Sequence, residues 1–219
     1  MAFDLHTPIC DLLGCEHPVV LAGMGGVARS ELVIAVTEAG GFGFLGMVRE
    51  PPALIRAEAA RIRERTSRDF GVNVIPAGTD PALLDAQIVA CIEAKVPVVA
   101  LFWDLQAEIV RRLNSEGILV VCQIGSLREA EEAQEAGAQA LIAQGWEAGG
   151  HVRGRTGLAS LVSDVVARVE VPVLAAGGIV DGAGLAAVLT LGAQGAVVGT
   201  AFLATRESFA HDYHKQRIL

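Results

Sequence analysis

The chain has 219 residues, which is enough for one large domain with a sizeable core. Apolar residues make up 52% of the sequence and aromatic residues only 5%, a balance that suits strands buried on both faces and alanine-rich helices packed against them. The formal net charge of −8 argues against the basic surface with which proteins bind nucleic acid or an anionic membrane.

Targeting segments and cysteine spacing further limit the classes of protein to which the chain can belong. No apolar run reaches the roughly 18 to 20 residues of a membrane span, and the N-terminus lacks a basic stretch followed by an apolar one, so we expect a cytoplasmic protein with no membrane partner. The four cysteines, Cys10, Cys15, Cys91 and Cys122, show no C-x-x-C spacing. We interpret them as reduced packing thiols and predict no metal site. Cys122 lies near the end of an expected strand, where a nucleophile could stand, although no base is visible beside it.

The first half of the chain alternates short apolar strands with amphipathic helices. We predict strands at 17–24, 42–47, 70–75 and 96–103, followed by helices at 29–39, 52–66, 81–94 and 105–115. Asp80 and Pro81 suit the N-cap and the first position of the third helix. The Arg/Glu face of the helix at 52–66 is interpreted as solvent-exposed surface.

The alternation continues in the second half. Strands are predicted at 118–123, 140–145, 171–176 and 195–200, and helices at 127–136, 158–169 and 182–192. Ser126 suits the N-cap of the first of these helices. The residues from 208 to 219 either form an eighth helix or fray. Eight strands with intervening helices imply right-handed crossovers and a parallel sheet, so we predict a (β/α)₈ TIM barrel, with residues 1–219 as a single domain. A doubly wound open sheet is the alternative.

Three successive strands end in loops of small residues. Gly149, Gly150 and His151 follow the strand at 140–145, Gly177 and Gly178 follow the next, and Gly199 and Thr200 follow the last. In a parallel barrel ligands bind at the carboxyl ends of the strands, and glycine lets the backbone approach a ligand closely. The last two loops therefore predict a phosphate cradle made of backbone N–H groups. The first loop predicts an active-site histidine, the alternative being a tight turn that carries a solvated imidazole.

Taken together, these stretches resemble the nitronate monooxygenases, formerly called 2-nitropropane dioxygenases, which are FMN-dependent (β/α)₈ enzymes. The matching stretches run nearly end to end: Leu21-Ala22-Gly23-Met24, Phe70-Gly71-Val72-Asn73, Ala143-Gln144-Gly145, Glu147-Ala148-Gly149-Gly150-His151, Ala175-Ala176-Gly177-Gly178-Ile179, and Gly199-Thr200 with Thr205-Arg206-Glu207-Ser208. FMN-dependent enoyl-acyl carrier protein reductases of the same superfamily carry a similar Gly-Gly-His loop. The motif therefore fixes the superfamily better than the substrate.

The resemblance implies a role for each matching residue. Gly23, Met24, Asn73 and Gln144 would line the isoalloxazine of FMN, Gly149 would lie close to the flavin, and Gly177, Gly178, Gly199 and Thr200 would hold its phosphate. Amide side chains suit the edge of a flavin ring because they both donate and accept hydrogen bonds. The alternative for Asn73 and Gln144 is that they bond to neighbouring backbone, as polar residues at strand ends usually do.

The resemblance also implies a reaction. His151 matches the histidine that takes the α-proton from a neutral nitroalkane, and the flavin with molecular oxygen then oxidises the nitronate. An imidazole suits this proton transfer because histidine side chains titrate near neutral pH. The other four histidines, His6, His17, His211 and His214, match no motif and are interpreted as surface residues.

Two other functions stay open: an FMN-dependent reductase that uses NAD(P)H to reduce an enoyl thioester, and a truncated flavin-binding barrel without turnover. Family members continue beyond the Glu-Ser motif through a segment that packs against the barrel, so the C-terminal region here is expected to be shortened. A surface left uncovered in this way would be apolar. We therefore expect a homo-oligomer.

Overall fold

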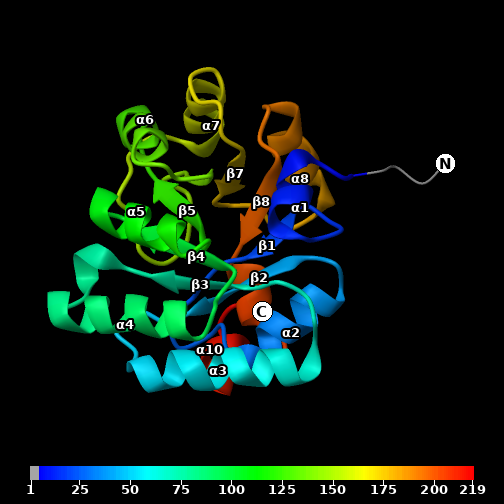
Figure 1. Ribbon diagram of the computed structural model, residues 1–219. Coiled ribbons are helices and arrows are strands. Elements are labelled where there is room, and N and C mark those ends of the chain that lie inside the picture. The colour runs from blue at the N-terminus through cyan, green and yellow to red at the C-terminus, as the bar shows by residue number, and fades with distance from the viewer. Residues whose placement is uncertain (1–4) are drawn as a thin grey trace.

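The structure is a computed structural model that describes residues 5–219. Its eight strands are all parallel and form a closed barrel in sequence order, with β8 paired to β1 (Figure 1). The strands are β1 Val19–Leu21, β2 Phe42–Gly46, β3 Gly71–Val74, β4 Val98–Phe102, β5 Leu119–Ile124, β6 Ala140–Gln144, β7 Val173–Ala176 and β8 Gly195–Val198. The barrel is the predicted fold, and the open doubly wound sheet is excluded.

A helix follows every strand. These helices are α2 Ser30–Glu38, α3 Pro52–Arg65, α4 Pro81–Glu93, α5 Ala107–Ser115, α6 Leu127–Glu135, α7 Leu158–Val166, α8 Gly182–Thr190 and α9 Thr200–Leu203, and a short 3-10 turn, η1 Pro76–Gly78, precedes α4. Asp80 caps α4 by accepting from the N–H groups of Ala82 and Leu83, and Ser126 caps α6, as predicted. None of the helices formed by residues 5–219 is long and apolar enough to cross a membrane.

The core has two layers. Side chains that point outward from the strands pack against the helices, while inward-pointing side chains such as Phe42, Phe44 and Leu174 fill the barrel. Helix α1, Pro8–Leu13, closes the amino end of the barrel by inserting Ile9 and Leu13 into this inner layer. No pattern in the sequence predicted α1, because its six residues are too few for a helical period to be recognised.

The face of α3 that was interpreted as solvent surface contains one exception. Glu58 is only 2% exposed. Its carboxylate accepts the N–H of Ser30 at the start of α2, 2.8 Å away, and a 2.6 Å bond from Arg61. That contact satisfies an N–H that the first turn of α2 leaves without a helical acceptor. The prediction of a fully solvated face is therefore wrong at Glu58.

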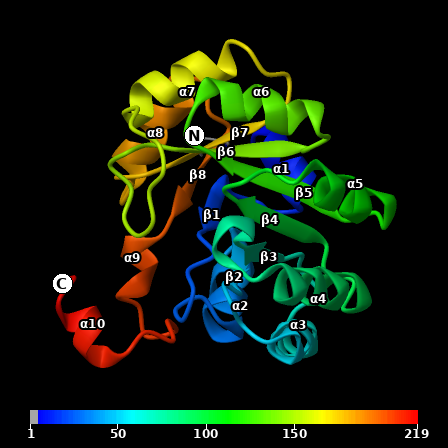
Figure 2. The same cartoon turned by 90° about the vertical axis from the view of Figure 1, so that its left-hand side faces the viewer.

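The predicted ends of the first and last elements also differ from the structure. β1 covers only residues 19–21, because Pro18 has no N–H to donate and the chain turns after Leu21, where Met24 N bonds to Ala22 O. β8 stops at Val198, and Thr200 begins α9. A continuous helix over 208–219 does not form: Phe209 N donates to Val27 O beside the barrel, and only Asp212–Gln216 forms a helix, α10, which lies beyond α9 and away from the strands (Figure 2).

Candidate active site

The residues proposed to bind flavin or substrate all lie at or just after the carboxyl ends of strands. Gly23 and Met24 follow β1, Asn73 lies in β3, Gln144 ends β6, and the remaining residues, Gly149, His151, Gly177, Gly178, Gly199 and Thr200, belong to the segments after β6, β7 and β8. Strands that are far apart in the sequence thus bring these residues to one end of the barrel. This is the end at which (β/α)₈ enzymes bind their ligands.

Gly23 and Asn73 are in direct contact across the end of the barrel. The side-chain amide of Asn73 donates to Gly23 O at 3.1 Å, and the residue is 7% exposed. A Cβ on Gly23 would lie 2.2 Å from the Cβ of Asn73, which no real structure tolerates. Glycine is therefore required at position 23 for Asn73 to occupy its position, and one donor of Asn73 is already used by backbone.

The segments after β6, β7 and β8 touch one another and the segment after β1. A Cβ on Gly199 would lie 3.5 Å from Met24 Sδ, one on Gly149 3.1 Å from Thr200 Oγ1, and one on Gly177 3.1 Å from Ala148 N. Gly145 N also donates to Ala176 O at 2.9 Å. The predicted site residues therefore form one connected surface.

Gly177 and Gly178 follow β7 in backbone conformations that favour glycine. Their φ angles are +128° and +67°, which side-chain-bearing residues rarely adopt. Within the described part of the chain, no backbone carbonyl accepts from the N–H groups of Gly177, Gly178 or Gly199. Backbone N–H groups of this kind are the donors on which the predicted phosphate cradle depends.

His151 is exposed on the loop between β6 and α7. Its backbone oxygen accepts a 3.0 Å bond from Gln144 Nε2, and its ring meets Trp103 edge to face, with the ring centroids 6.1 Å apart and an interplanar angle of 88°. Residues 145–157, between β6 and α7, form the loop that carries His151, here called the histidine loop. Gln144 holds this loop through one donor, in addition to any contact that it makes with a ligand. The imidazole remains accessible at the carboxyl end of the barrel.

Sequence reasoning missed three residues around this loop. Trp103 and Asp104 follow β4, and Arg153 stands two residues after His151; Arg153 Nη1 lies 2.6 Å from Asp104 Oδ1. The available signals were weak: Trp103 is one of only two tryptophans and stands at a predicted strand end, and Arg153 belongs to the Gly-rich loop itself. The pairing between these segments depends on the barrel bringing β4 and β6 close together.

Cys122 takes no part in this site. It is 3% exposed and belongs to the layer between the barrel and the helices. Burial raises the pKa of its thiol to about 12. A thiol rather than the nucleophilic thiolate is therefore present at neutral pH. The four histidines without a motif, His6, His17, His211 and His214, are exposed, as predicted.

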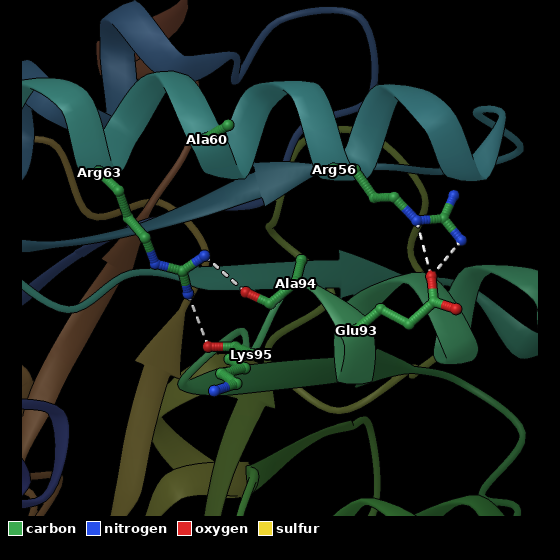
Figure 3. Close-up of a pocket in the computed structure, with 6 residues that line it drawn as sticks. All are labelled: Arg56, Ala60, Arg63, Glu93, Ala94 and Lys95. Atoms are coloured by element: carbon green, nitrogen blue, oxygen red, sulfur yellow. Dashed lines mark hydrogen bonds and ion pairs between the residues drawn. The ribbon is translucent and has the colours of Figure 1, made fainter.

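A hollow of about 480 Å³ lies elsewhere, between α3 and α4, and is lined by Arg56, Ala60, Arg63, Glu93, Ala94 and Lys95 (Figure 3). Its two arginines already have partners: Arg63 donates to Ala94 O and Lys95 O at 2.5 and 2.6 Å, and Arg56 binds Glu93. Arg63 thereby satisfies carbonyl groups at the end of α4. This hollow is a helix-capping arrangement and offers no unpaired arginine to a ligand.

Comparison with known proteins agrees with the barrel fold and identifies a family. The sequence model of the nitronate monooxygenase family matches residues 6–219. The chain is 38% identical over 217 residues to the (3aS,4S,5R,7aS)-5-hydroxy-7a-methyl-1-oxo-octahydro-1H-indene-4-carboxyl-CoA dehydrogenase of Mycobacterium tuberculosis, covering 98% of this chain and 60% of the relative. It is 32% identical over 254 residues to a probable nitronate monooxygenase of Staphylococcus aureus, covering 96% of this chain and 71% of that relative.

Solved structures give the same result. FabK from Thermotoga maritima superposes with a TM-score of 0.92 at 39% identity, covering 97% of this chain and 67% of that one. A nitroalkane oxidase from Streptomyces ansochromogenes superposes with a TM-score of 0.86 at 37% identity, covering 95% and 71%. The chain thus spans about 60% of the length of the curated dehydrogenase and a larger share of these two structures. It belongs to the nitronate monooxygenase family of flavin oxidoreductases.

Proposed function

We propose that this protein is an FMN-dependent oxidoreductase that oxidises alkyl nitronates, and nitroalkanes once their α-proton is removed, with molecular oxygen. The observation that carries the proposal is the position of His151. An accessible imidazole stands at the carboxyl end of a barrel whose family is flavin-dependent, on a loop held by Gln144 and by the ring of Trp103.

The residues present fit FMN. We propose that Gly23, Met24, Asn73 and Gln144 line the flavin ring, with Gly149 beside it, and that Gly177, Gly178, Gly199 and Thr200 hold the phosphate. The positive φ angles of Gly177 and Gly178 and the N–H groups that lack a backbone acceptor support the phosphate assignment. Bound there, FMN supplies the electron transfer, and the protein supplies position and polarity.

His151 acts in this proposal as the general base. A nitroalkane carries an acidic C–H next to its nitro group, and the imidazole would take that proton and hold it while the substrate becomes a nitronate. A preformed nitronate has already lost the proton. Only the neutral substrate therefore needs the base.

The test compares these two substrates in a His151→Asn variant. Turnover of the neutral nitroalkane should fall by about 10² to 10⁴, the usual contribution of a general base, while turnover of nitronate and flavin content stay near those of the wild type. His214→Asn, which removes another exposed histidine, is the matched control. Equal losses on both substrates would show that His151 serves binding or structure instead.

A second candidate is a flavin-dependent oxidoreductase of thioesters. It is favoured by the relatives, since one is named as the dehydrogenase of an indene-carboxyl-CoA and FabK is an enoyl reductase. Stopped-flow mixing separates the two: rapid bleaching of the flavin by NADH or NADPH, and reoxidation by an enoyl thioester, would favour the reductase. A yellow protein inactive in both assays would favour a flavin-binding barrel without turnover.

A further inference from the structure

We propose that the end of β4 positions the histidine loop, through a brace made of Trp103, Asp104, Arg153 and Glu129. In this arrangement Trp103 supports the imidazole and the Asp104–Arg153 ion pair holds the loop beside it. Arg153 and Trp103 are then positioning residues for His151. The catalytic part of this inference rests on the proposed function, whereas its geometric part can be tested without it.

The loop needs support near its tip. Its neck is closed by Trp146 N donating to Thr156 O at 3.0 Å, and Leu158 N donates to both carboxylate oxygens of Glu147 at 3.1 and 3.0 Å. Between these ties lie two exposed glycines, Gly149 and Gly150, and Gly150 has a φ of +74° with no atom within 4 Å of where a Cβ would be. His151 directly follows this pair, and the bond from Gln144 holds its backbone oxygen but not its ring.

Two consecutive residues after β4 provide that support. Trp103 and Asp104 have φ angles of +56° and +45°, a conformation that costs side-chain-bearing residues about 1 to 2 kcal/mol each. Trp103 packs on Phe102, with ring centroids 4.4 Å apart, and presents itself to His151. Asp104 reaches Arg153 at 2.6 Å. The consecutive residues Trp103 and Asp104 thus contact His151 and Arg153, respectively. These two partners stand on either side of Val152.

Arg153 and its neighbour make further contacts with a third segment. Arg153 Nε lies 3.4 Å from Glu129 Oε1, and the other oxygen of Glu129 accepts Gly125 N at 2.7 Å. Gly154 lies so close to Gly125 that a Cβ on either residue would come within 3 Å of the other's backbone. The stretch from His151 to Gly154 is therefore held by the segments after both β4 and β5.

The brace should affect geometry more than stability. The side chains of Arg153 and Asp104 are 43% and 53% exposed, and ion pairs at that exposure contribute little to the free energy of unfolding. A base displaced by about 1 Å, however, can lose about 10²-fold in rate. Arg153→Gln should therefore leave the unfolding midpoint nearly unchanged while turnover of a neutral nitroalkane falls at least about tenfold and turnover of nitronate is retained.

The geometric test uses Trp103 as a reporter of His151. In a Trp146→Phe background Trp103 is the one tryptophan left, and a protonated imidazole in contact with an indole quenches its fluorescence. The emission of Trp103 should therefore depend on pH through its contact with the imidazole. The other ionisable groups on the loop of His151 and on the segments packed against it include Asp104, Glu129, Glu147, Arg153 and Arg155, so His151→Asn is included to identify the signal with the imidazole.

Four variants in the Trp146→Phe background test whether Arg153 holds His151 against Trp103. The pH-dependent change in emission should disappear in His151→Asn and in Arg153→Gln, return in part in Arg153→Lys, and persist in Arg128→Gln. Arg128 lines the same surface but pairs within its own helix with Glu132, so it is the matched control. An unchanged titration in Arg153→Gln would overturn the brace, whatever the activities. A titration lost as predicted, in an enzyme that turns over no nitro compound, would sustain the brace and refute the proposed function.

Discussion

At the scale of single residues, Gly23 matters through the side chain that it lacks. Asn73 occupies the space where a Cβ on residue 23 would be, and its amide is fixed on Gly23 O. The two residues therefore specify one another, although fifty positions separate them. Both side chains make the backbone bond that was the alternative to flavin contact: Asn73 donates to Gly23 O and Gln144 donates to His151 O. These bonds orient each side chain before any ligand arrives.

Gly178 offers a direct test of the phosphate cradle. Valine at this position introduces a β-branched side chain at a φ of +67°, so Gly178→Val should purify with little or no FMN. Gly117→Val is the control, because Gly117 has a φ of +73° and open space around it but lies in the turn between α5 and β5. Flavin content is measured by absorbance after gel filtration. Full occupancy in Gly178→Val would mean that the phosphate binds elsewhere.

Three buried thiols predict how stability depends on pH. Burial raises the pKa of Cys15, Cys91 and Cys122 from an ordinary 9.0 to about 12. The unfolded chain then loses its thiol protons before the folded chain does, so the free energy of unfolding should fall as the pH rises from about 9 to about 12, by up to about 1.4 kcal/mol per pH unit for each thiol. Urea unfolding between pH 8 and about pH 10.5 measures this slope.

Matched core variants separate the thiol effect from packing. Cys91→Ala removes one titrating group and should make the alkaline slope shallower, even though its stability at pH 8 is lower. Ile88→Val deletes a methyl group from the same helix and should lower stability about equally at every pH, by about 0.5 to 1.5 kcal/mol. Parallel curves for the wild type and Cys91→Ala would contradict the assignment of the slope to that thiol.

At the scale of elements, the loop after β6 also serves as the cap of α7. Helix α7 has no side-chain cap from Gly157, its own N-cap residue, and Glu147 supplies the acceptor for Leu158 N from within the histidine loop. Glu147→Ala should therefore lower the free energy of unfolding by about 1 kcal/mol and also reduce activity, because the same contact ties down the histidine loop.

Asp80→Ala provides the comparison for this prediction. Asp80 caps α4 through two backbone N–H groups, and its loss should lower stability by a similar amount, about 1 kcal/mol, with no effect on turnover. Urea unfolding and steady-state rates are measured on both variants. If Glu147→Ala destabilised the protein but left turnover unchanged, the cap of α7 would be energetically independent of the position of His151.

Most elements could be predicted because their signals are local. Apolar periodicity, Asp80 with Pro81 and Ser126 mark where helices begin, and these predictions agree with the structure. Three features could not be predicted in this way. α1 is too short to show a period, Glu58 is buried because α2 needs an acceptor, and residues 208–211 are not helical because Phe209 N donates to Val27 O. Each depends on a partner that is distant in the sequence.

The same distinction applies to the candidate site. The glycine-rich loops and His151 stand out in the sequence because glycines and a histidine at strand ends have few other uses. Trp103 and Arg153 do not stand out in the sequence, because tryptophan and arginine are also common in packed interfaces and on surfaces. Only the adjacency of the segments after β4, β5 and β6 brings Trp103 to His151 and Arg153 to Asp104.

At the scale of the whole molecule, the C-terminal segment carries apolar side chains in contact with solvent. Phe209, Tyr213 and Leu219 are 66%, 58% and 93% exposed. We expect this 219-residue chain to self-associate through them, and sedimentation velocity at micromolar concentration measures its state. Phe209→Ser should shift the distribution toward monomer, whereas Val180→Ser, at an equally exposed apolar residue outside this segment, should not. A monomeric wild-type chain would refute the expectation.

The closure of the barrel by α1 has a consequence for the order in which the chain folds. Thr7 Oγ1 donates to Gln194 O at 2.6 Å, and Val20 pairs with Val197, so the first and last parts of the described chain complete each other's contacts. During synthesis the docking site of α1 is incomplete until β8 has left the ribosome. Ile9 and Leu13 therefore lack their packing partners until nearly the entire chain has been made. Contacts of such long sequence separation form late and slow folding. A nascent chain halted before residue 194 should accordingly expose α1 to protease, and release of the last strand should protect it.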